Sequence, residues 1–431
     1  MPDALILRGG RVVDASGERL ADVLVREGVV AEVGERLDPV GAPALDAAGC
    51  VVAPGLVDLH VHLREPGDEE AETIETGARA AALGGFTAIV AMPNTQPPLD
   101  DASTVGAVLA TGRDALCEVA SSGCITKGRL GEELAPMGEL HALGVRIFTD
   151  DGACVGRAAV MRRALEYSCS LPGAVIAQHA EDASLAGGGH MHEGRWSSLL
   201  GIPGRPAEAE CTIVARDLVL ARLTGARVHF LHLSTAQAVD MVRAAKAQGL
   251  PVTAEVAPHH FTLTDAECAG FDPAFKVHPP LRGDADVEAI KAALADGTID
   301  AIATDHAPHV AEAKERPFEE APPGMLGLET ALALTLTELV EPGVVTLADA
   351  LALLSWRPAA IAGLGEHGNL IEPGQVANLC VIDPALQWDV DPAKLASKAR
   401  NTPYAGRKLT GRARHTILRG EPVVVDAEAQ R

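Results

Sequence analysis

Residues 57–63 read VDLHVHL, an apolar run that carries histidines at positions 60 and 62. Side chains on a β-strand alternate between its two faces, so His60 and His62 point to the same side. Two imidazoles held on one rigid strand can chelate one metal ion. They can equally form a hydrogen-bonded pair in a protein core, and this short pattern alone does not decide between the two interpretations.

Seven more apolar runs follow, with helix-like stretches between them. The runs are FTAIVAMPN (86–94), EVASSGCIT (118–126), GVRIFTDDG (144–152), AVIAQHAED (174–182), ARVHFLHLST (226–235), PVTAEVAPHH (251–260) and DAIATDHAPH (300–309). The helical stretches are expected at 72–83, 161–167, 209–223 and 235–247. Alternation of strand and helix predicts an α/β protein with a parallel sheet. Eight such units predict a closed (β/α)8 TIM-like barrel over residues 55–364.

The two ends of the chain have a different pattern. LILRGGRVVD (5–14) and LADVLVREGVVAEVG (20–34) near the start cluster β-branched residues and are broken by glycine, as is HTILRGEPVVVD (415–426) near the end. Such segments are typical of short strands joined by turns. We therefore predict one small β domain, a β-sandwich, assembled from residues 1–54 and 365–431.

Composition excludes several classes of protein. The 431 residues include 36 Lys and Arg against 59 Asp and Glu, a net charge of −23 that repels nucleic-acid backbones. A hydrophobic content of 47% excludes wholesale disorder. The start lacks a secretory signal pattern, no uncharged apolar run is as long as a membrane span, and the eight cysteines contain no C-x-x-C pair. These features predict a cytoplasmic protein that binds neither nucleic acid nor membrane.

Polar residues gather near the end of the predicted strands. They are His60 and His62 in the first run, Asp150 and Asp151 in the fourth, His179 in the fifth, His232 in the sixth, His259 and His260 in the seventh, and Asp305, His306 and His309 in the eighth. The carboxyl ends of barrel strands carry the active site in nearly every enzyme of this architecture. Imidazoles and carboxylates that converge there indicate a metal centre.

A series of motifs runs through the chain in a fixed order. It comprises PGLVDLHVHLREPG (54–67), AMPNT (91–95), TDDG (149–152), TAEVAPHH (253–260), HPPLRG (278–283), IATDHAPH (302–309), GNLIEPGQVANLCVID (368–383) and NTPYAG (401–406). The series resembles the dihydroorotase family, in the cyclic-amidase branch of the amidohydrolase superfamily, and specifically its bacterial class with REPG after the H-x-H. The resemblance implies a metal-dependent hydrolase that interconverts L-dihydroorotate and N-carbamoyl-L-aspartate in pyrimidine (UMP) synthesis.

The resemblance also implies two divalent metal ions per chain. One would be held by His60, His62 and Asp305, and the other by His179 and His232. Related families bridge the ions with a carboxylated lysine, but this chain has no lysine between positions 127 and 246. Asp151 occupies the place where the bacterial class uses an aspartate bridge, whereas Asp150 points the other way on a regular strand. Zinc is the expected metal for such ligands, with manganese and cobalt as alternatives.

Substrate contacts follow in part from chemistry and in part from the resemblance. Arg64 lies two residues beyond His62, and its planar guanidinium suits a substrate carboxylate, although an ordinary surface arginine is the alternative. The resemblance adds further substrate contacts: His62, Asn94, His309, the backbone of Pro323 and Gly324, and His278, which stands where the family usually has asparagine. It gives Asp305 the role of general acid–base, acting on a hydroxide shared by the two ions. Residues 309–328 are expected to form a lid or substrate wall, or else a solvated connector.

Two other functions remain open at this stage. The chain could act on a related cyclic amide, as hydantoinases and allantoinases do, but Arg64 and the missing lysine favour a substrate with a carboxylate. It could also be a non-catalytic scaffold for aspartate transcarbamoylase, but all six ligand positions are filled. A complex with that transferase and a homodimer are expected from the resemblance only.

Overall fold

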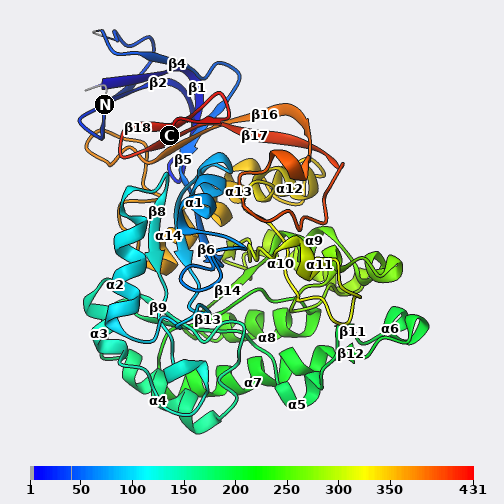
Figure 1. Ribbon diagram of the computed structural model, residues 1–431. Helices are drawn as coiled ribbons and strands as arrows, with labels where there is room; N and C mark the ends of the chain where they lie inside the picture. The colour runs from blue at the N-terminus through cyan, green and yellow to red at the C-terminus, as the bar shows by residue number, and fades with distance from the viewer. Residues whose placement is uncertain (1–3, 40) are drawn as a thin grey trace.

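A computed structural model describes residues 4–39 and 41–431 (Figure 1). Residues 1–3 and 40, which the predicted small β domain includes, lie outside the described residues. The chain has the predicted mixed α/β architecture, with a strand-rich region from both termini above a larger region of alternating strands and helices. Within the described part of the chain, no helix has the length and apolar character needed to cross a lipid bilayer.

Eight short parallel strands form the centre of the larger region, one in each predicted apolar run. They are β6 (Leu56–Val61), β7 (Phe86–Ala91), β8 (Glu118–Ser121), β9 (Ile147–Phe148), β10 (Val175–Gln178), β13 (Val228–Phe230), β14 (Val252–Val256) and β15 (Ala301–Ile302). Ladders join β6 to β7 to β8 and run from β9 through β10, β13 and β14 to β15. Parallel bridges between Gly123 and Phe148 and between Val61 and His306 connect the two groups. The pairing therefore returns to the strand from which it began.

Helices surround this ring and connect its strands. The longer ones are α1 (Ile74–Leu83), α2 (Ala102–Thr111), α4 (Ala158–Ser168), α7 (Ala207–Thr224), α8 (Ala236–Ala247), α10 (Asp284–Asp296) and α13 (Leu347–Leu354). The shorter ones are α3 (Met137–Ala142), α5 (Ala183–Ala186), α6 (Arg195–Leu200), α9 (Pro258–Thr262), α11 (Ala311–Lys314), α12 (Ala331–Thr335) and α14 (Trp356–Ala362). The four helices predicted from sequence periodicity correspond to α1, α4, α7 and α8, with bounds that differ by up to three residues.

Segments from both termini join in one sheet, because β5 pairs with β1 on one side and with β16 on the other. Its strands are β1 (Ala4–Asp14), β2 (Gly17–Arg26), β3 (Val29–Gly34), β4 (Ala44–Asp46), β5 (Val51–Pro54), β16 (Leu379–Asp389), β17 (Lys408–Leu418), β18 (Glu421–Val425) and β19 (Glu428–Ala429). Pairing is continuous from β19 through β16 and β5 to β3. The predicted β-sandwich is therefore corrected in one respect: the strands form one continuous nine-stranded sheet by hydrogen bonding, because β5 pairs with both β1 and β16. A further short pair, β11 (Met191–His192) with β12 (Gly204–Arg205), lies apart from it.

The core follows the alternation of side chains along the strands. Val90, Ile147, Ala177, Leu231 and Ala301 come from five strand segments and form one buried cluster within the ring. The residues beside them on the same strands belong to a larger cluster that includes the inner faces of the surrounding helices. The described cysteines are all free and six of the eight are buried, so most of them act as small apolar residues of the core.

Leu353 offers a test of how strongly this core stabilises the protein. It lies in α13 with 0% of its surface exposed, so Leu353→Ala removes buried methyl groups and leaves a cavity. We expect the free energy of unfolding to fall by about 2–5 kcal/mol, measured by urea denaturation. Leu199→Ala, at a helical position that is 68% exposed, is the matched control and should change it by less than about 0.5 kcal/mol. Equal losses in both variants would contradict this assignment of the core.

Candidate active site

His60 lies within β6, and the other residues of the predicted cluster lie just beyond the strands, where the backbone turns into the loops. His62 follows β6 directly, His179 follows β10 directly, and Asp305 comes three residues after β15. Three of the residues concerned, Arg64, His232 and Asp305, have positive φ angles of 62°, 30° and 49°. Residues other than glycine rarely adopt a positive φ, and those that do are concentrated at functional sites. Here the turns aim the side chains over the end of the ring.

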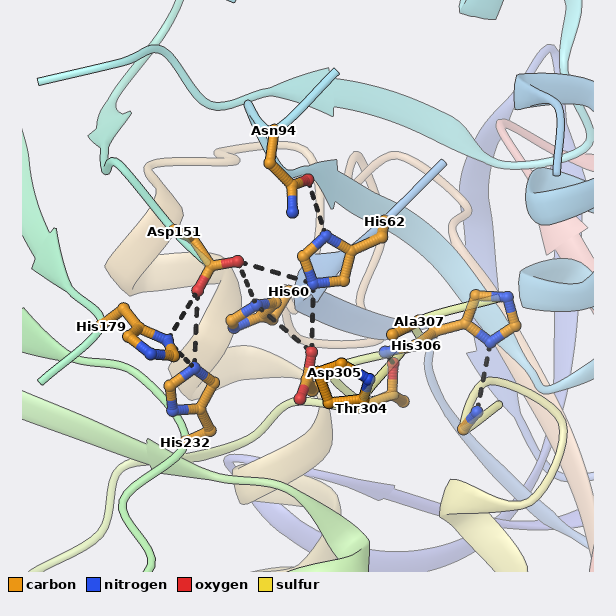
Figure 2. A network of polar contacts seen from close by, with 12 residues as sticks. His60, His62, Asn94, Asp151, His179, His232, Thr304, Asp305, His306 and Ala307 are labelled. Atoms are coloured by element: carbon orange, nitrogen blue, oxygen red, sulfur yellow. Dashed lines mark hydrogen bonds and ion pairs between the residues drawn. The ribbon is translucent and has the colours of Figure 1, made fainter. Parts of the chain in front are cut away.

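Asp151 lies at the centre of the cluster, with one carboxylate oxygen toward each of two histidine pairs (Figure 2). Its Oδ2 is 3.3 Å from His60 Nε2 and 3.5 Å from His62 Nε2. Its Oδ1 is 3.5 Å from both His179 Nδ1 and His232 Nε2. The structure thus brings together two groups of possible metal ligands that share this one carboxylate.

These distances fit metal ligation. Ligand atoms about 2.1 Å from a tetrahedral ion stand about 3.4 Å apart, which is longer than most hydrogen bonds. His60 Nε2 and Asp151 Oδ1 are buried and have no hydrogen-bond partner among the described residues. Unsatisfied buried polar atoms are costly, and these two lie on different sides of the cluster, one toward each histidine pair, so each points to a bound cation. The donor set of imidazoles and carboxylates suits two divalent ions.

Asp305 approaches the first histidine pair from the side opposite Asp151 (Figure 2). Its Oδ1 lies 3.1 Å from His62 Nε2 and 3.6 Å from His60 Nε2. The other ring nitrogen of His62, Nδ1, lies 2.8 Å from Asn94 Oδ1. Asn94 therefore orients a histidine of the cluster as well as facing the cavity beside it.

Electrostatics of the cluster favour ionised carboxylates. Burial by itself raises the pKa of Asp151, but the imidazoles of His60, His179 and His232 around the carboxylate outweigh burial and hold the pKa well below its ordinary value. The pKa of Asp305 is also lowered, because the hydrogen bond from His62 and the nearby imidazoles outweigh the effect of burial. Both side chains are thus anions at neutral pH, as metal ligands must be.

A cavity of about 330 Å³ opens beside the cluster. All the predicted site residues except His60 contribute to its lining, including Arg64, Asn94, His278, His309, Pro323 and Gly324. Arg64 makes no ion pair with any described residue, and donates through Nε to the Pro308 carbonyl oxygen at 3.0 Å. His309 Nε2 donates to the Pro323 carbonyl oxygen at 2.8 Å. The cavity therefore joins the cluster of histidines and aspartates to a guanidinium that has no ion-pair partner among the described residues.

Residues 309–328 form a wall of this cavity, through His309, Pro323 and Gly324. Lys314, within this segment, donates through Nζ to the Pro273 and Pro322 carbonyl oxygens at 2.8 and 2.9 Å and so holds the segment against its neighbours. The structure thus favours the predicted wall over a solvated connector.

His278, the residue that replaces the usual asparagine, follows a buried segment and lines the cavity. Burial and the positive charge of Arg205 hold its pKa well below the ordinary value, so the ring is neutral, and its Nε2 has no hydrogen-bond partner among the described residues. Arg205 and Glu181, which sequence analysis missed, form an ion pair of 2.5 Å in the same lining. The sequence signal that could have placed Glu181 in the site is its position two residues after His179.

Several nearby histidines do not join the cluster. His259 and His260, predicted at a strand end, lie instead in helix α9, because Pro258 begins a helical turn there. His260 contacts the Pro279 carbonyl oxygen at 3.1 Å. His306 points away from the cluster, and its Nδ1 accepts a hydrogen bond from the Gly327 amide (Figure 2). Asp150 likewise faces away and accepts hydrogen bonds from the Ile125 and Thr126 amides.

A ring of parallel strands with four histidines and two aspartates over its carboxyl edge defines a metal-dependent hydrolase of the amidohydrolase type. Comparison with known proteins agrees. A family model described as dihydro-orotase-like matches residues 49–238, and one described as amidohydrolase family matches residues 224–424. The L-hydantoinase (dihydropyrimidinase) of Arthrobacter aurescens has a TM-score of 0.90 at 27% identity, over 100% of this chain and 98% of that one.

Relatives in sequence are closer still. The dihydroorotase of Pelotomaculum thermopropionicum is 50% identical over 98% of this chain and 99% of its own length. That of Streptomyces coelicolor is 48% identical over the same shares of both chains. The chain belongs to the dihydroorotase family, and the resemblance predicted from its motifs is confirmed.

Proposed function

We propose that the protein is a dihydroorotase, which hydrolyses L-dihydroorotate to N-carbamoyl-L-aspartate and closes the ring again in the reverse direction, within pyrimidine (UMP) synthesis. One observation carries the proposal: a cavity of about 330 Å³ contains both the cluster around Asp151 and the unpaired Arg64. The cluster around Asp151 suits the ring amide of dihydroorotate, and Arg64 suits the carboxylate of the same molecule. The relatives that share about half of the sequence carry this name.

The cluster would hold two divalent ions. His60, His62 and Asp305 would hold one, His179 and His232 the other, and Asp151 would bridge them. Bound there, the ions would lower the pKa of water and polarise the ring carbonyl. We propose zinc as the metal, because imidazole and carboxylate ligands suit it.

Asp305 is the proposed general acid–base. Its carboxylate faces the cavity, and its lowered pKa keeps it ionised at neutral pH, so an oxygen without a proton faces the attacking water. In ring opening it takes a proton from the attacking water and delivers it to the amide nitrogen as the carbon–nitrogen bond breaks. Ring closure reverses these steps, with the proton returning from the nitrogen through Asp305 to the departing water.

Arg64 is proposed to hold the substrate carboxylate through paired hydrogen bonds. His309, Asn94, His278 and the backbone of Pro323 and Gly324 would complete the subsite. His278 would present a neutral ring to the substrate, since its pKa is held below the ordinary value by burial and by Arg205.

Replacement of Arg64 tests this subsite. Arg64→Met removes a charged donor, which is worth about 1.5–3 kcal/mol, so kcat/KM for dihydroorotate should fall about 10–150-fold, mainly through KM. Arg64→Lys should recover part of the loss, because it restores the charge without the paired geometry. Steady-state kinetics measure both. If Arg64→Met has unchanged KM and kcat, the carboxylate binds elsewhere.

Metal analysis combined with a dihydroorotate assay tests the function as a whole. The purified protein should contain about two divalent ions per chain and open dihydroorotate. Protein that holds both ions but leaves dihydroorotate unchanged, alone and with aspartate transcarbamoylase, would refute the proposal.

Hydantoin, dihydrouracil and allantoin are the comparison substrates, because the fold is shared with hydantoinases. They lack the carboxylate that Arg64 would bind, so we expect much slower turnover. A preference for one of these uncharged rings would favour the alternative function of a related cyclic amidase.

The remaining assignments are also proposals. We propose that the ring of strands and its helices form a (β/α)8 barrel domain of residues 55–364, and that residues 1–54 and 365–431 form the small β domain. We also propose a cytoplasmic homodimer that can associate with aspartate transcarbamoylase and does not bind nucleic acid or membranes. Co-elution with the transferase and the molecular mass in solution test the two association states.

A further inference from the structure

Glu255 is a carboxylate inside the ring of strands, near the carboxyl end of β14 (Val252–Val256). Its neighbours along the strand, Ala254 and Val256, pack in the main apolar core, so alternation places Glu255 on the inner face. The residue is 1% exposed. A buried carboxylate is costly unless its charge and oxygens are satisfied, so its partners indicate why it is there.

Each oxygen of Glu255 contacts one histidine. Oε1 lies 2.8 Å from His60 Nδ1, and Oε2 lies 3.0 Å from His229 Nε2. His229 Nδ1 in turn lies 2.8 Å from the Thr253 hydroxyl. This row runs from Thr253 through His229 and Glu255 to His60. Its residues are buried or half-buried and come from the paired strands β13 and β14 and from β6, which is not a neighbour of either.

The contacts determine where the hydrogens lie. An ionised carboxylate only accepts hydrogen bonds, so both histidines must donate to Glu255. His229 donates from Nε2, and its Nδ1 then accepts from the Thr253 hydroxyl. His60 donates from Nδ1, which leaves Nε2 without a hydrogen in the neutral ring. That Nε2 is the buried atom without a hydrogen-bond partner, 3.3 Å from Asp151 Oδ2.

We propose that Glu255 is a positioning residue of the metal centre, which fixes the orientation and tautomer of His60 and is itself fixed by His229. This inference rests on the proposed function, because it needs a metal ion beside His60. Partners of this kind behind metal-ligating histidines typically change metal affinity by about 10–100-fold when they are replaced. None of the predicted site residues fulfils this role for His60.

Glu255→Gln is the direct test, because it keeps the shape but turns one acceptor into a donor that competes with a histidine. Zinc is titrated into the metal-free protein in competition with a chromogenic chelator. The wild type should bind two ions, and the variant should lose about 10–100-fold in affinity for one of them. Asp14→Asn is the matched control, since Asp14 is also a buried, hydrogen-bonded carboxylate but lies in the terminal sheet. It should bind both ions as the wild type does.

The outcomes separate the two proposals. If the wild type binds no zinc, the proposed metal centre is wrong. If the wild type binds two ions and folded Glu255→Gln binds both within threefold of it, the centre stands and the positioning role is overturned. Should the variant not fold, nitrogen-15 NMR of histidine in the metal-free wild type decides the matter. The proposal expects a hydrogen of His60 on Nδ1 toward Glu255, and a His60 ring whose only hydrogen lies on Nε2 would overturn it.

Discussion

Replacing Asp151 with asparagine should reduce the metal content from about two ions per chain to one or fewer and abolish most activity. The carboxylate faces His60 and His62 with one oxygen and His179 and His232 with the other, at 3.3–3.5 Å. An amide nitrogen cannot replace the oxygen on one of the two sides, so one group loses its shared ligand. Loss of one ion removes about 4 kcal/mol of transition-state stabilisation, so kcat should fall about a thousandfold.

Asp150→Asn is the matched control for this experiment. Asp150 is the adjacent buried carboxylate, but its Oδ1 accepts the Ile125 and Thr126 amides at 2.9 and 3.0 Å, away from the cluster. The control should retain both ions and lose stability instead. Metal analysis of the two purified variants, together with kcat and thermal unfolding, separates the effects. Two ions in Asp151→Asn, or loss of metal in Asp150→Asn, would contradict the assignment.

Much of the architecture could be predicted because it depends on local patterns. Each of the eight apolar runs contains one strand of the ring. Asp150 and Asp151 face different ways, as alternation predicts, although both lie beyond the end of β9. Local patterns could not predict which of the terminal strands pair with one another. A sandwich and a single continuous sheet need the same alternating strands, and the difference depends on β5, which pairs with both β1 and β16.

The site was partly predictable for a related reason. Residue types and their places at strand ends indicated His60, His62, His179, His232 and Asp305, which the structure brings together. The directions in which these side chains point depend on the positive φ angles of His232 and Asp305, and no pattern in the sequence predicts those angles. Glu255 and Arg205 were missed because their importance comes from partners far apart in the chain. A lone glutamate within the apolar strand VTAEV was the only available signal.

Asp305→Asn should separate proton transfer from metal binding. Asparagine keeps an oxygen near His62 and His60, so both ions should remain bound, but it cannot take a proton from water. General acid–base groups typically contribute 10²–10⁴-fold, so we expect kcat for dihydroorotate to fall by about that factor with little change in KM.

Asp300→Asn is the matched control. Asp300 comes just before β15, at the end of the strand opposite to Asp305, and pairs with Lys246 at 2.6 Å. Its kcat should stay within about threefold of wild type, since it does not line the cavity. If Asp305→Asn binds two ions and retains kcat within tenfold, the proton must move through another group that faces the cavity, of which Glu181 and His278 would be the first to replace.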